Sequence, residues 1–220
     1  MNNSFYLLAE SYNSNKTLRL LIKLFPYGGI VDNTLASFYS KERERRLKVF
    51  YDEIANGDLQ LTDEIIKSEE FLYKYYITLK AVLETRRSEK IQYFARLLKN
   101  SESELLNKET DYYEDFLKVL DDLTYQEIFV LLKLREREKE HATIVGNRLM
   151  INKRFYRKFK SDLASVMGIS ENEIISILIR LGRTGCVNYD KNMQHFNEVN
   201  DSIATTDFYK KLEDLALYNP

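Results

Sequence analysis

The sequence predicts an all-α, helix-dominated fold, and three features of its 220 residues carry that prediction. Apolar residues make up 44% and charged residues 30%, which is typical of a globular protein and excludes a disordered chain. Seven Gly and two Pro are too few for the many turns of a β-sandwich or β-barrel. Apolar side chains also recur every three to four residues along most of the chain, which is the period of an amphipathic helix.

The N-terminal elements are expected in the following order. Residues 4–24 alternate apolar and polar stretches, which predicts a helical hairpin or a broken helix. Residues 25–29 contain one Pro and two Gly and should end it. A helix over residues 32–55 follows, and its charged middle, Ser40 to Arg46, is expected to leave the core because it has no apolar residue for nearly two turns.

Two more helices complete the N-terminal half. Thr62 is expected to cap a helix that reaches Glu84, and Ser88 opens a strongly periodic helix that ends at Asn100. The polar residues 101–110 read as a linker. The sequence therefore predicts an N-terminal helical bundle over residues 1–109 and a C-terminal module over residues 110–220.

In the C-terminal module, the apolar residues Phe116, Leu117 and Leu120 come first, and a helix over residues 125–137 is expected after them. Thr124 and Glu127 have the spacing of a capping box, in which each side chain satisfies a backbone donor of the other residue. The charged tail from Arg135 to Glu140 is expected to be a solvated last turn. A segment with β-forming residues around Gly146 and a helix over residues 153–166 should follow.

The most informative pattern begins at the end of that helix. Gly168 stands where a left-handed residue ends a helix, and Ser170 with Glu173 forms a second capping box. The expected packing residues of the two helices are Leu163, Val166, Ile169, Ile174, Leu178 and Leu181. Residues 185–189 suit a turn and a strand, and residues 199–203 a returning strand. The pattern resembles a winged-helix domain, a helix-turn-helix with a small β-wing.

Two uses of the second helix, residues 171–183, are considered, and the sequence favours the first over the second. In the first, Ile175 and Ile179 project outward and contact a protein partner, the helical bundle or a second copy of the chain, since exposed apolar groups seek cover. In the second, the helix enters the major groove of DNA. The residues expected to bind DNA are Lys153, Arg154, Arg157, Lys158, Asn172, Ser176, Arg180 and Arg183. Residues 153–183 hold seven positive and three negative charges, which favours DNA, whereas Glu171 and Glu173 would repel phosphates.

No pattern of catalytic residues or cofactor ligands is recognised. The single cysteine, Cys186, falls on a hydrophobic strand position and is expected to be a buried apolar residue rather than a nucleophile aided by His141 or His195. Phosphate-binding glycine loops and zinc-site spacings are lacking. We therefore expect no catalytic residue, no metal site, no cofactor and no enzymatic activity.

Charge and targeting features limit the partner classes. The net charge of −1 offers no global attraction to nucleic acid or to an anionic membrane. Residues 25–48 could lie on a membrane as a basic amphipathic segment, but interleaved acidic residues favour a salt-bridged helix instead. The start of the chain lacks the features of a signal peptide and one cysteine forms no internal disulfide, so a cytoplasmic location is expected.

A resemblance over the whole chain rests on two segments. Thr85 to Asn100 ends in Leu-Leu-Lys-Asn, and Phe116 to Thr124 ends at a Leu-Thr helix cap. This order is similar to that of uncharacterised bacterial helical proteins and, more distantly, of an abortive-infection-associated family. The resemblance implies a bacterial or phage-related cytoplasmic origin and a role in phage defence or stress, and it carries over no functional residue.

Overall fold

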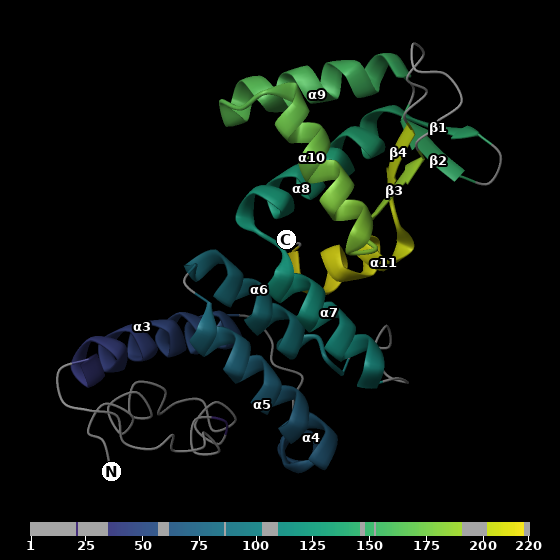
Figure 1. The fold of residues 1–220 in the computed structure, drawn as a ribbon. Helices are drawn as coiled ribbons and strands as arrows, with labels where there is room; N and C mark the ends of the chain where they lie inside the picture. The colour runs from purple at the N-terminus through teal and green to yellow at the C-terminus, as the bar shows by residue number, and fades with distance from the viewer. Residues whose placement is uncertain are drawn as a thin grey trace. The chain divides into compact units, whose positions relative to one another are not determined.

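The computed structural model describes residue 21 and residues 35–56, 62–85, 87–102, 110–145, 148–151, 153–190 and 202–217. Helices dominate these residues, and their strands form two antiparallel pairs (Figure 1), which confirms the predicted fold class. The predicted elements at residues 4–24 and 25–29 lie outside the described residues, except for the buried Leu21. None of the described helices is both long and apolar enough to cross a lipid bilayer.

The chain divides into two compact units. Unit 1 comprises Met1–Asp122 and Asp214–Pro220, and unit 2 comprises Leu123–Glu213. The sequence placed the division at residues 109 and 110, and the contacts place it thirteen residues later, between Asp122 and Leu123.

Unit 1 is a helical bundle. Its described helices are α3 (Leu35–Ala55), α4 (Asp63–Lys67), α5 (Glu69–Glu84), α6 (Ser88–Lys99) and α7 (Thr110–Asp122). Helix α6 contacts α3, α5 and α7, which explains why α7 belongs to this unit rather than to the C-terminal module. The largest fully buried apolar side chains of the unit include Phe50, Tyr51, Phe71, Phe94, Tyr113 and Phe116.

The helix expected from residue 62 to residue 84 is two helices in the structure. Thr62 caps α4 as predicted, because its side chain accepts a hydrogen bond from the amide of Ile65. The break falls at Ser68, whose backbone is extended. The Ser68 hydroxyl donates to the Ile65 carbonyl at 2.7 Å and accepts from the Phe71 amide at 3.2 Å. One serine therefore ends α4 and starts α5.

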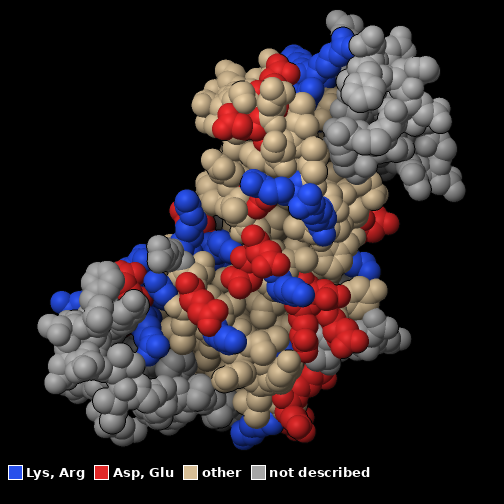
Figure 2. Space-filling model, in the orientation of Figure 1, with Lys and Arg blue, Asp and Glu red and all other residues tan. Residues whose placement is uncertain are grey.

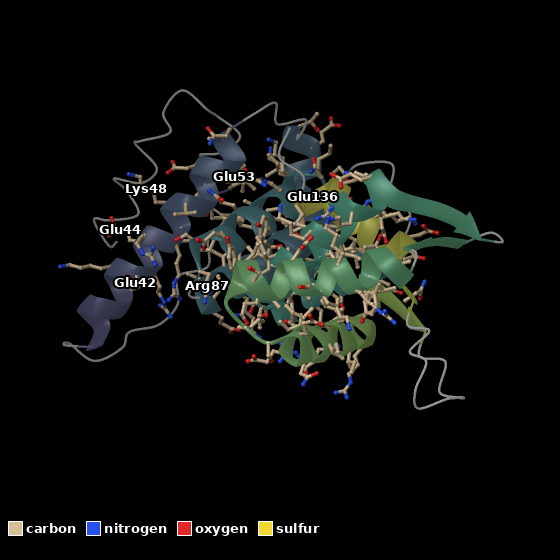
Figure 3. All side chains as sticks on the ribbon, turned by 90° about the horizontal axis from the view of Figure 1, so that it is seen from above. Glu42, Glu44, Lys48, Glu53, Arg87 and Glu136 are labelled. Carbon is tan, nitrogen blue, oxygen red and sulfur yellow. The ribbon has the colours of Figure 1, made fainter. Side chains whose placement is uncertain are left out.

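The charged middle of α3 leaves the core only in part. Arg46, which was also expected to leave it, is 15% exposed and donates to the Leu83 carbonyl of α5. Arg43, Glu44 and Arg45 are exposed, whereas Leu47 in the following turn is fully buried. Figure 3 shows Glu44 and Lys48 along this part of the helix. Arg45 also donates to the Ser88 hydroxyl at 3.1 Å, which ties α3 to the start of α6.

Unit 2 consists of helices with two small sheets. Its elements are α8 (Tyr125–His141), β1 (Ala142–Val145), β2 (Arg148–Ile151), α9 (Lys153–Met167), α10 (Glu171–Arg183), β3 (Val187–Asp190), β4 (Ser202–Thr205) and α11 (Asp207–Leu212). A π-helical segment, η1 (Glu213–Leu217), carries the chain from unit 2 back to unit 1.

The strands of unit 2 form two hairpins. β1 pairs antiparallel with β2, so the β-forming segment around Gly146 folds as expected. β3 pairs antiparallel with β4, with Val187 opposite Thr205. The returning strand covers Ser202–Thr205 rather than residues 199–203, and residues 191–201 lie outside the described part of the chain. β2 also contacts β4, which brings the two hairpins together.

Candidate nucleic-acid interface

The turn between α9 and α10 has the geometry that its sequence predicts. Gly168 adopts a φ of +66°, a conformation that glycine reaches without a Cβ clash. Ser170 and Glu173 form the capping box: the Ser170 amide donates to Glu173 Oε2 at 2.8 Å, and the Glu173 amide donates to Ser170 Oγ at 3.3 Å. Hydrogen bonds from the backbone amide and then the hydroxyl of Ser170 lower the pKa of the Glu173 carboxyl. This carboxylate therefore stays ionised at neutral pH.

The packing of α9 and α10 agrees with the prediction except at one residue. Leu163, Ile174, Leu178 and Leu181 are buried, and Ile169 is half-buried. Val166, expected between the two helices, is instead 72% exposed. The reason is its angular position on α9, since Val166 lines a groove toward α8 together with Phe159 and Leu163.

The outward face of α10 is mainly polar. Asn172, Ser176, Arg180 and Arg183 are all exposed and follow one another along the helix at spacings of three or four residues. Ile175 and Ile179 flank this row and are half-buried. The apolar patch on which the expected protein contact depends is therefore smaller than the sequence suggests.

A buried carboxylate holds Arg180 in place. Arg180 Nε donates to Glu127 Oε1 at 3.0 Å, although the Arg180 side chain remains 54% exposed. The other oxygen of Glu127 accepts from the amide and hydroxyl of Thr124, both at 2.8 Å, which is the capping box predicted at the start of α8. Glu127 thus connects the first turn of α8 to the outward face of α10. The sequence indicated its role as a cap but gave no sign of its contact with Arg180.

Helix α9 contributes further positive charge. Arg157 and Lys158 are exposed. The side chain of Lys160 is mostly buried. Its Nζ lies 4.0 Å from Glu171 Oε2 and over the ring of Tyr156. Lys153 and Arg154 fall in the first turn of α9, and their side chains are outside the part that the structure describes.

Charge is distributed unevenly between and within the units. Unit 2 has fifteen Lys and Arg against twelve Asp and Glu, and unit 1 has eighteen against twenty-two, giving +3 and −4 and together the net charge of −1. In Figure 2, basic side chains lie over the C-terminal half of α10, and acidic ones lie near the turn from α9. Of the seven basic residues counted over residues 153–183, five lie on α9, and two, Arg180 and Arg183, lie in the C-terminal half of α10.

The tail of α8 is not the solvated turn that its alternating charges predict. The helix continues to His141, and Glu138 is 3% exposed. Its carboxylate accepts hydrogen bonds from the amide and hydroxyl of Thr205 in β4 and from Arg135 Nη1. Arg135 is also bonded to Glu213 at 3.0 Å. Helical periodicity did not predict this cluster of Arg135, Glu138, Thr205 and Glu213, because Thr205 and Glu213 lie far along the chain from α8.

The residues considered for nucleophilic chemistry are not brought together in the described part of the chain. Cys186 is fully buried, as expected, and burial raises the pKa of its thiol. His195 and the side chain of His141 lie outside the described residues. Among those that are described, no three His, Cys, Asp or Glu side chains gather in a way that could hold a metal ion. The expectation that the chain is not an enzyme stays a prediction.

Comparison of the chain with protein-family models, with curated proteins and with solved structures found no match.

Proposed function

We propose that unit 2 is a winged-helix domain that binds duplex nucleic acid through the outward face of α10. The single observation that carries this proposal is the exposed row of Asn172, Ser176, Arg180 and Arg183 along one helix. Amide, hydroxyl and guanidinium groups are the donors and acceptors that read base edges and hold phosphates.

The order of the elements supports the winged-helix assignment. Helix α8, the β1–β2 hairpin, the α9–α10 pair and the β3–β4 hairpin follow one another, with β2 beside β4. In helix-turn-helix domains the second helix of the pair enters the major groove while the first crosses the backbone. Arg157 and Lys158 on α9 would then contact phosphates.

One of the two acidic residues at the start of α10, Glu171, weighs less against this function than its charge suggests. The Glu173 carboxylate is engaged by Ser170, and Glu171 lies near Lys160. Lys160 offsets part of the negative charge of Glu171, whereas Glu173, bonded to neutral donors, stays ionised and still repels phosphates.

The test is fluorescence anisotropy of a labelled random-sequence DNA duplex titrated with the full chain at about 50 and 200 mM salt. The variant Arg157→Glu with Arg183→Glu removes one cation from each helix and keeps the ion pair between Arg180 and Glu127. The matched control, Arg43→Glu with Lys48→Glu, makes the same total change of charge on exposed residues of α3.

We expect binding at low salt that weakens steeply at high salt, because phosphate contacts release counterions. The α9–α10 variant should lose affinity and reduce the slope of log K against log salt by about two. The α3 control should bind like the unchanged chain. Absence of binding at low salt, or equal losses in both variants, would refute the proposal and favour the protein contact at Ile175 and Ile179.

The wider expectation from the sequence, a non-catalytic regulatory or defence-associated protein of bacterial or phage origin in the cytoplasm, stays a prediction.

A further inference from the structure

A groove between α8 and α9 lies apart from the outward face of α10. It encloses about 300 Å³, and no residue of α10 lines it. The floor is formed by Phe129, Phe159 and Leu163, and Val166 stands at its edge with 72% of its surface exposed. Val166 thus adds exposed apolar surface to a groove whose other apolar residues are buried or half-buried.

The charges along the groove follow a regular order on α8. Lys133, Glu136, Arg137 and Glu140 line it at spacings of three, one and three residues, so they occupy one face of the helix. Their side chains are 43%, 58%, 35% and 59% exposed. Their signs read plus, minus, plus, minus along the chain. Read backward, the order becomes minus, plus, minus, plus.

We propose that this groove is the contact surface between two copies of the chain. In an antiparallel α8 pair with a two-fold axis between Glu136 and Arg137, Lys133 of one copy faces Glu140 of the other. Glu136 likewise faces Arg137. Every facing pair then has opposite signs, whereas a parallel arrangement in the same register would oppose like charges. Charge complementarity of this kind selects the partner and its orientation.

The existing contacts of these charges are compatible with exchange between copies. Lys133 and Glu136 are paired at 2.7 Å, and Arg137 is paired with Glu140 at 3.4 Å and with Asp162 at 2.9 Å. All are partly exposed pairs that contribute little to stability by themselves. Two copies would add the facing partners and would cover Val166 at the edge of the groove.

The proposal does not depend on nucleic-acid binding, and its test contains no nucleic acid. Sedimentation velocity of the full chain over a range of concentrations should show growth from 26.1 kDa to twice that mass. Two charge variants follow: an acidic one, Lys133→Glu with Arg137→Glu, and a basic one, Glu136→Lys with Glu140→Lys. Arg43→Glu with Lys48→Glu on α3 is the control for the acidic variant, because it makes the same change of charge outside the groove.

Each groove variant alone should be a monomer, since four like charges would face four like charges, and we expect the dimer dissociation constant to rise about tenfold or more. An equimolar mixture of the two should regain the dimer, which also shows that both variants fold. The α3 control should dimerise like the unchanged chain. The proposal is overturned by a chain that stays monomeric at every concentration, by variants that still dimerise alone, or by a mixture that does not associate.

Discussion

Two glutamates of α8 show how single residues join distant parts of unit 2. Glu127 and Glu138 are 6% and 3% exposed, yet both are charged side chains on a helix whose sequence alternates acid and base. Each carboxylate is bonded to a neighbour in the chain and to a residue of a later element, Arg180 in α10 or Thr205 in β4. Burial of a charge is tolerated only with such partners.

The variant Glu127→Gln should lower the free energy of unfolding by about 1 to 2 kcal/mol. The amide offers one acceptor oxygen, so either Thr124 or Arg180 loses its bond and a donor faces a donor. Urea unfolding followed by far-UV circular dichroism measures the change. Glu171→Gln, which alters a 51% exposed carboxylate, should change stability by less than about 0.5 kcal/mol. Equal effects of the two variants would show that Glu127 does not hold Arg180.

Helix ends are the elements that sequence reasoning predicts best. The caps at Thr62, Thr124, Ser170 and Gly168 depend on hydrogen bonds or backbone conformations within a few residues, so local sequence specifies them. Ser68 was missed because the apolar periodicity continues across it, and only the structure shows that its hydroxyl serves both helices.

A substitution at Gly168 measures how much the left-handed backbone at one such helix end contributes to stability. Gly168→Ala should destabilise unit 2 by about 1 kcal/mol, because the left-handed backbone disfavours a Cβ. No atom of a more distant residue lies within 4 Å of the added Cβ, so the loss comes from the local backbone alone. The same substitution at Gly182, inside α10 and exposed, should stabilise by about 0.5 to 1 kcal/mol. Thermal unfolding distinguishes the two, and changes of the same sign at both positions would contradict the left-handed conformation at Gly168.

The candidate interface could be predicted only in part. The sequence identified Asn172, Ser176, Arg180 and Arg183 as surface residues of one helix, and the structure exposes all four. It did not predict that Ile175 and Ile179 are half-buried or that Val166 is exposed, since helical periodicity gives the angle of a residue but not the neighbours that cover it. The Arg180 partner lies 53 positions away along the chain, beyond any local pattern.

At the scale of the whole molecule, the chain enters unit 2 once and then returns to unit 1. The returning residues, Asp214–Pro220, follow directly after Glu213, which belongs to unit 2 and pairs with Arg135 and Lys139. Leu215, Ala216 and Leu217 are buried. Asn100 at the end of α6 donates through Nδ2 to the Leu215 carbonyl at 2.8 Å. A short C-terminal segment therefore completes a bundle that the N-terminal half begins.

Removal of residues 214–220 should consequently weaken unit 1 and spare unit 2. Loss of two buried leucines and one alanine from unit 1 is expected to cost about 3 kcal/mol or more of its stability. Hydrogen exchange measured by mass spectrometry should show faster exchange in α6, while exchange in α9 and α10 stays unchanged because Glu213 and its ion pairs remain. Asn100→Ala removes only the hydrogen bond to Leu215 and should accelerate the same segment to a smaller extent. Faster exchange confined to α9 and α10 in the shortened chain would instead mean that these last residues stabilise unit 2.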